Sequence, residues 1–133
     1  PTDELDHTQF TVEEMAAACY EATARKKITL AHVYTPDGIR NALRAGVRSI
    51  EHGNFLDEES AAAMKAAGAF FVPTLTTYEL ISAFGASQGV PANMLAKIDQ
   101  AKAGGFRSLE IARAAGLRIA SGSDVLASMQ PFK

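Results

Sequence analysis

The sequence contains one cysteine, no tryptophan and no long apolar run. A single cysteine, Cys19, cannot form an internal disulfide; its helical surroundings predict a small buried residue, with a catalytic thiol as the alternative. Apolar stretches stay well short of the roughly 18 residues that a membrane-spanning helix needs. The opening residues also lack the regions of a signal peptide. We therefore expect no membrane partner and a cytoplasmic location.

An excess of one charge is lacking as well. Lys and Arg number 13 and Asp and Glu 15, which gives a net charge of -2. This balance does not favour nucleic acid as a partner. A glycine-rich phosphate loop is absent too, because "SGSD" and "AGGF" lack the spacing of a P-loop or a GxGxxG motif. The length of 133 residues with 47% hydrophobic residues fits about one globular domain.

The sequence does have a repeated alternation of helical patterns and short apolar runs. Capping signals predict helices that begin after Thr11, Thr35 and Asp57. Strands are predicted over residues 28–33, 47–51, 69–75 and 117–124, and a longer segment, 78–115, holds a loop and one or two helices. Ala-Gly joins helix to strand in "RAGVRSI", "AAGAFFV" and "AAGLRIA". This α/β repeat predicts parallel strands whose carboxyl ends share the ligand-binding face.

Polar side chains fall at the ends of three of these predicted strands: His32 in "LAHVY", His52 in "IEHGN" and Asp124 in "ASGSDVL". Neutral imidazoles and a carboxylate that converge from different strands suit a transition-metal ion such as zinc. The spacing alone is not specific. Each histidine can equally be a hydrogen-bonded structural residue, and Asp124 can simply cap a following helix.

Three other polar residues, Tyr34, Glu51 and His7, also need an interpretation. Tyr34 projects to the same side as His32 if the strand continues, so its phenol can reach the same cavity or pack as an ordinary aromatic. Glu51 should point to the opposite side of its strand from His52, which predicts a structural role. His7 lies in a polar segment and is expected to be solvated.

The segments "ITLAHVYTPDGIRNALRAGVRSIEHGNFLDEES", "FFVPTLTTY" and "AGLRIASGSDVL" together resemble the second half of the barrel of the amidohydrolase superfamily. The nearest branch is the imidazolonepropionase-like group, which includes Xaa-Pro dipeptidases (prolidases). The order of HxY, "SIEHG", "VPTL" and "GSD" is more specific than any one motif. The likeness runs from "HTQFTVEEM" to Met129.

The resemblance implies a metal-dependent hydrolase on a TIM-type (β/α)8 barrel, with one or two Zn²⁺ ions. His32 would match the strand-five metal ligand and His52 the strand-six ligand. Asp124 would match the strand-eight aspartate, which touches metal and also moves the proton during attack by metal-activated hydroxide. Tyr34 would hold the substrate or polarise its carbonyl.

The sequence also departs from the family pattern. The family's HxH pair and its strand-four lysine do not occur here, and a complete barrel takes about 250 residues. We therefore expect residues 1–133 to be the carboxyl-terminal half of such a barrel, strands five to eight. The isolated chain would be inactive and would associate with the missing amino-terminal half or with itself.

The expected substrate is an amide, namely an Xaa-Pro dipeptide or an N-acyl amino acid. Cyclic-amide hydrolysis of the imidazolonepropionase kind and arginine-type carboxypeptidase action are alternatives within the enzyme class. Outside it, the chain could be an α/β domain that binds a small molecule without catalysis, or a structural piece whose histidines are ordinary polar residues.

Overall fold

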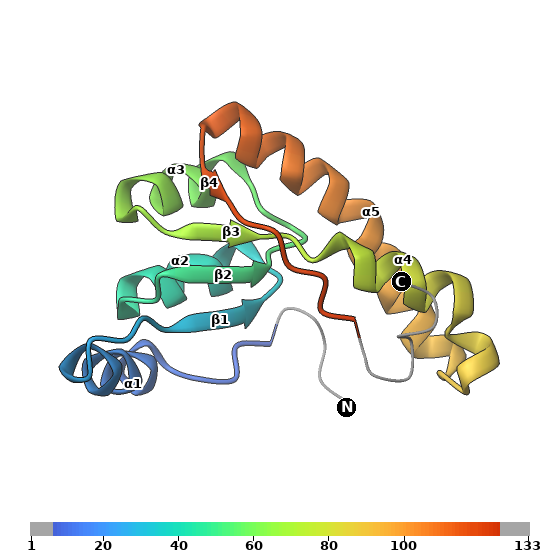
Figure 1. Cartoon of the computed structure of the whole chain (residues 1–133), viewed down its shortest axis with the longest axis horizontal. Coiled ribbons are helices and arrows are strands. Elements are labelled where there is room, and N and C mark those ends of the chain that lie inside the picture. The colour runs from blue at the N-terminus through green and yellow to red at the C-terminus, as the bar shows by residue number, and fades with distance from the viewer. Residues whose placement is uncertain (1–6, 126–133) are drawn as a thin grey trace.

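The structure is a computed structural model that describes residues 7–125; the rest of the predicted domain, 1–6 and 126–133, lies outside the described residues. Helices and strands alternate along most of it (Figure 1). The helices are α1 (Val12–Ala24), α2 (Pro36–Ala45), α3 (Glu58–Ala67), α4 (Leu75–Phe84), the short 3₁₀ helix η1 (Ala86–Gln88) and α5 (Ala92–Ala115). The strands are β1 (Leu30–Val33), β2 (Ser49–His52), β3 (Phe70–Val72) and β4 (Arg118–Ile119).

Local sequence signals mark the starts of α1, α2 and α3, as predicted, whereas α4 begins at Leu75, inside the predicted strand 69–75, and β3 spans only Phe70–Val72. The side chains that accept hydrogen bonds from a first helical turn are those of Thr11 for α1, Thr35 for α2 and Asp57 for α3. Glycines with positive φ end α2, α3 and α5: Gly46, Gly68 and Gly116. Glycine adopts this left-handed conformation without the steric cost that a Cβ brings, so the chain can leave each helix and enter the next strand directly.

The described strands form one sheet in the order β1-β2-β3-β4, and each pair is parallel. This confirms the predicted parallel arrangement. The register places one row of residues across all of these strands: Ala31, Ile50, Phe71 and Ile119. The carboxyl ends of the strands consequently lie at one end of the sheet, beside α4 and α5 (Figure 1).

The fourth strand is shorter than predicted. It spans only Arg118–Ile119, whereas the sequence predicted strand over 117–124. The N–H of Ala120 still donates to the carbonyl of Phe71 at 2.9 Å, but β3 ends two residues before Thr74, at Val72. The residue between them is a proline, which has no N–H to offer a neighbouring strand. Asp124 therefore lies beyond the paired part of the sheet.

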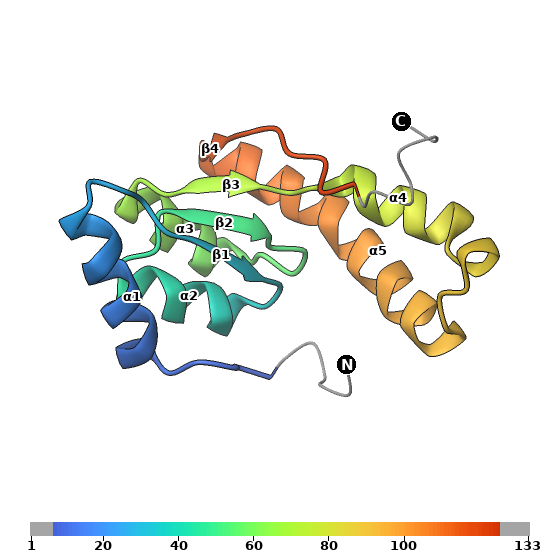
Figure 2. The ribbon, with the colours of Figure 1, turned by 60° about the horizontal axis from the view of Figure 1, so that its bottom comes forward.

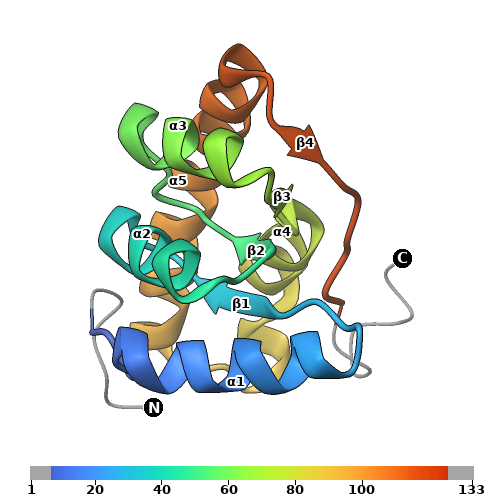
Figure 3. The ribbon, with the colours of Figure 1, turned by 90° about the vertical axis from the view of Figure 1, so that its left-hand side faces the viewer.

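The hydrophobic core lies on one face of this sheet. Ile50 and Phe71 are fully buried there against Ile39 of α2, Met64 of α3 and Ala112 of α5. Figure 3 shows these helices on the same side of the strands. On the opposite face, Leu30 and Phe70 remain accessible, with 68% and 38% of these residues exposed.

Helix α5 is held tightly against the loop that follows β2. Asn54 Nδ2 donates to the carbonyl of Ala101 at 2.7 Å, and Ser108 Oγ donates to the carbonyl of Asn54 at 2.7 Å. Ser108 Oγ also accepts the N–H of Leu56 at 3.0 Å. A Cβ on Gly104 would lie 2.4 Å from the Asn54 carbonyl oxygen, so only glycine allows this approach. Helices α4 and α5 extend together past the end of the sheet (Figure 2).

Among the helices described between residues 7 and 125, none has the length and apolar character that crossing a membrane requires.

Candidate functional site

The candidate site lies at the carboxyl ends of β1 and β2. His32 is the third residue of β1, and the register pairs it with Glu51; His52 ends β2 and is paired with Val33. Strict alternation along β2 would place His52 on the same face as Ile50, which is the face that the helices cover. His32 belongs to the other row, so regular strands would keep the two imidazoles on opposite faces.

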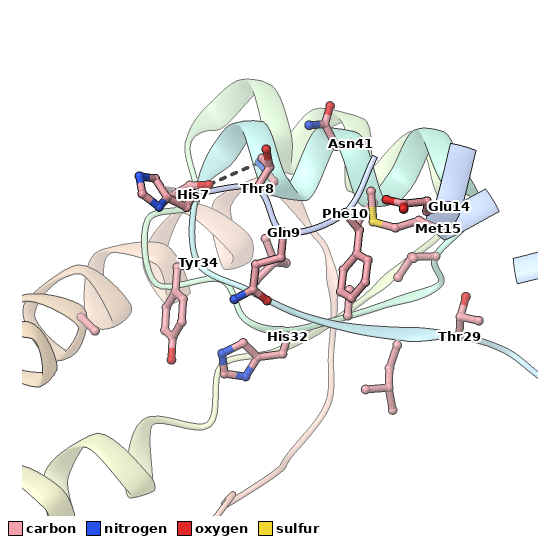
Figure 4. Close-up of a pocket in the computed structure, with 18 of the residues that line it drawn as sticks. His7, Thr8, Gln9, Phe10, Glu14, Met15, Thr29, His32, Tyr34 and Asn41 are labelled. Carbon is pink, nitrogen blue, oxygen red and sulfur yellow. Dashed lines mark hydrogen bonds between the residues drawn. The ribbon is translucent and has the colours of Figure 1, made fainter. Parts of the chain in front are cut away.

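A change in backbone conformation brings the imidazoles together. His52 has φ +72°, in the left-handed region that non-glycine residues adopt rarely. This breaks the alternation of β2, and the ring of His52 lies against that of His32 with 4.2 Å between the ring centroids. Tyr34 completes the cluster: its ring lies 5.0 Å from that of His32 and 5.5 Å from that of His52. Figure 4 shows His32 and Tyr34 projecting to the same side of the chain.

A threonine from the next strand exit holds the ring of His52. Thr74 Oγ1 lies 2.6 Å from His52 Nδ1, and both residues are only 4% exposed. Sequence reasoning assigned no role to Thr74, although it belongs to the "VPTL" motif that contributed to the family resemblance. The bond leaves Nε2 as the ring nitrogen of His52 that can serve a ligand.

The protonation state of His52 suits a metal ion. Burial, and then the nearby charge of His32, lower the pKa of His52 to about 4, while Asp124 opposes this shift. His52 is therefore neutral near pH 7, which is the form of imidazole that binds metal. Burial raises the pKa of Tyr34, the nearby Tyr78 hydroxyl lowers it and Asp124 raises it. The net increase keeps the Tyr34 phenol protonated and able to donate.

Asp124 stands apart from the imidazole pair. It is exposed, has φ +47° and lies five residues beyond the end of β4. Its charge reaches His52 and Tyr34 and affects their pKa values. Within residues 7–125, however, no group of three or more His, Cys, Asp or Glu side chains lies close enough together to hold a metal ion. The two adjacent imidazoles thus fit part of a metal shell rather than a whole one.

Tyr78 is a second residue that sequence reasoning missed. It lies in α4, is 1% exposed, and its ring stands at 85° to that of His52 with 5.9 Å between the centroids. Its hydroxyl is buried without a hydrogen-bond partner of good geometry in the described part of the chain. Burial is the main cause that raises the pKa of Tyr78, and the nearby Tyr34 adds to the increase. No local sequence pattern distinguishes it from a core tyrosine.

A pocket of about 960 Å³ runs along β1 beside the cluster. His32 and Tyr34 lie on its wall, together with segment 7–10, and Figure 4 shows this segment beside β1. Part of α5 lines it as well, through Met94 and Ile98. The described chain thus offers a concave surface next to the two imidazoles, as small-molecule sites generally do.

The remaining polar candidates take structural positions. Cys19 is buried, as predicted, and its Sγ lies 3.1 Å from Thr29 Oγ1. His7 is exposed, as predicted, and belongs to the lining of the pocket. Glu51 lies beside His32 in the register and accepts a hydrogen bond from the Ser49 hydroxyl at 2.5 Å.

The parallel βα order, with its polar side chains at one end of the strands, defines part of a (β/α) barrel. The chain belongs to the Amidohydrolase family, whose sequence pattern matches residues 3–133. It is 32% identical to ochratoxinase from Aspergillus niger over 122 residues, which are 92% of this chain and 25% of that protein. The crystal structure of that ochratoxinase has a TM-score of 0.80. These findings confirm the predicted family.

Solved prolidase structures are also similar. A prolidase in complex with N-methylphosphonate-L-proline is 43% identical, with a TM-score of 0.93, over 97% of this chain and 32% of that one. A Xaa-Pro dipeptidase with methionine bound in its active site is 29% identical, with a TM-score of 0.73, over 90% and 30%. These matches confirm the predicted partial barrel. The chain spans about a quarter to a third of the length of these relatives.

Proposed function

We propose that the protein containing this chain is a metal-dependent amide hydrolase, and that His32 and His52 bind the metal ion. The observation that carries this proposal is the contact between the two imidazoles at the ends of adjacent parallel strands, 4.2 Å apart between centroids. The left-handed backbone at His52, which creates the contact, costs of order 1–3 kcal/mol. Such a cost is typical of functional sites, where the surrounding structure maintains it.

Asp124 is the third residue that we assign to the site. Its charge already reaches His52 and Tyr34, and a carboxylate is a suitable additional metal ligand and proton acceptor. A bound divalent ion of this kind supplies Lewis acidity, which polarises a carbonyl and makes water a better nucleophile near neutral pH. We assign zinc as that ion because imidazole and carboxylate donors suit it.

The chain's own side chains then orient the substrate and move the proton. Tyr34 donates its phenolic proton to an oxygen of the substrate beside the imidazoles, an interaction whose removal typically costs about 3 kcal/mol. Asp124 accepts the proton of the attacking water and passes it to the leaving nitrogen. The pocket beside β1 contributes part of the wall against which the substrate lies.

Xaa-Pro dipeptides and N-acyl amino acids are the substrates that we propose. The support is similarity to a prolidase that binds a proline derivative, to a Xaa-Pro dipeptidase and to ochratoxinase. A cyclic amide is the alternative within the same reaction class. We further propose that the 133-residue chain alone is inactive, since the described residues supply only part of a metal shell and leave β1 as an edge strand.

The test is to remove each imidazole in the full-length protein. His32→Ala and His52→Ala should each lower the bound zinc content and reduce kcat/KM by about 100-fold or more. Glu110→Ala, on an exposed position of α5, is the control for an unrelated change. Metal content is measured by elemental analysis. Hydrolytic activity is measured on Xaa-Pro dipeptides, N-acyl amino acids and a cyclic imidazolone. Unchanged metal content and rates in both histidine variants would refute the proposal.

A further inference from the structure

Thr74 departs from the behaviour of the other capping threonines. It occupies the N-cap position of α4, where a threonine side chain normally accepts an N–H from the first turn. Thr11 and Thr35 do this, with extended backbones at φ -71° and -98°. Thr74 instead has φ +47° and ψ +35°, and its side chain caps nothing. The first turn of α4 therefore lacks the side-chain hydrogen bond that a capping threonine normally supplies.

The hydroxyl of Thr74 forms a hydrogen bond with the ring of His52 instead. Thr74 Oγ1 lies within hydrogen-bond distance of His52 Nδ1, at 2.6 Å, and both residues are 96% buried. A β-branched residue at positive φ is a genuine outlier, so the structure tolerates strain at this position. The partner at the other end of the bond, His52, is strained in the same way at φ +72°.

We propose that Thr74 is a positioning residue for His52: its hydroxyl oxygen accepts a hydrogen bond from the Nδ1–H group, so that the unprotonated Nε2 faces the site. This gives a role to the threonine of "VPTL", which the proposed function leaves unused. The inference rests on the proposed function, in which His52 binds metal. Hydrogen bonds to the second ring nitrogen generally fix the tautomer and orientation of a metal-binding histidine.

The first experiment reads the tautomer of His52 directly in the full-length, metal-free protein. The ¹⁵N chemical shifts of the ring, assigned with His52→Asn, should show Nδ1 protonated and Nε2 unprotonated near pH 7. A ring protonated on Nε2 would mean that Thr74 donates instead of accepting, and would overturn the proposal. This measurement requires no Thr74 variant to fold and no activity.

The second experiment removes and restores the hydroxyl. Thr74→Val keeps the size and branching of the side chain without the hydroxyl, and should weaken Zn²⁺ binding by about 10- to 100-fold while His52 loses its single tautomer. Thr74→Ser should restore both. Thr11→Val, which makes the same change at the threonine that caps α1, should leave both unchanged.

The outcomes separate this inference from the proposed function. Zn²⁺ affinity and tautomer unchanged in Thr74→Val would overturn the role of Thr74 while leaving amide hydrolysis intact. Wild-type protein that neither binds Zn²⁺ nor hydrolyses amides would refute the proposed function. In that case the tautomer of His52 in the wild-type protein still decides whether Thr74 accepts a hydrogen bond from Nδ1–H.

Discussion

Acid should destabilise the metal-free protein through His52. Burial, reinforced by the charge of His32, lowers the pKa of His52 from 6.5 to about 4. The unfolded chain, in which the imidazole is solvated, titrates near the ordinary value of about 6.5. As the pH falls, the unfolded state therefore takes up this proton before the folded state does, and the equilibrium shifts toward unfolding.

The magnitude follows from the same pKa values. One pKa unit corresponds to about 1.36 kcal/mol, so the gap between 6.5 and about 4 corresponds to about 3 kcal/mol of folding free energy. This stability is fully present above pH 6.5 and is lost progressively as the pH falls to about 4. Other groups also titrate over this range, so the effect must be measured against a variant that lacks the imidazole.

His52→Asn is suited to that comparison. Asparagine does not titrate, tolerates the left-handed backbone at this position and retains a side-chain group that can hydrogen bond to Thr74. Urea unfolding of both metal-free full-length proteins from pH 7 to pH 4 gives the difference in their unfolding free energies. We expect wild type to lose about 3 kcal/mol more than His52→Asn. Parallel pH profiles for the two proteins would show that the imidazole is not buried in neutral form.

Two further predictions concern stability. Gly104→Ala should cost about 1–3 kcal/mol in urea unfolding, because the new Cβ would lie 2.4 Å from the Asn54 carbonyl oxygen; equal stability of Gly104→Ala and the exposed same-helix control Gln100→Ala would contradict the close packing. Asp57→Ala should cost about 1 kcal/mol in thermal or urea unfolding through loss of the cap on Ser60, while Asp57→Asn should retain most of it. Equal losses in both Asp57 variants would mean that charge, and not the cap, matters.

Most of the fold could be predicted because its signals are local. A capping residue such as Asp57 and a terminating glycine such as Gly68 lie within one helix and identify its ends without any tertiary information. Alternation of such helices with apolar runs then restricts the strands to parallel pairing. The extent of β4 was mispredicted, because a strand continues only as far as its neighbour does, and β3 stops before Pro73.

The candidate site was predictable in its residue types but not in its geometry. The positions of His32 and His52 at strand ends follow from the apolar runs before them. Their contact does not, because it depends on the left-handed backbone at His52, which periodicity cannot reveal. Thr74 and Tyr78 were missed for a related reason: both reach His52 from another element, through a fold that brings distant residues together. The assignment of Asp124 to the metal shell stays a prediction.

Helix α5 contacts both the pocket beside β1 and the segment that follows His52. Met94 and Ile98 of this helix contribute to the pocket wall, while its Ala101 and Ser108 form hydrogen bonds with Asn54, two residues after His52. A change in the position of this 24-residue helix would therefore alter both the pocket wall and the segment that follows His52.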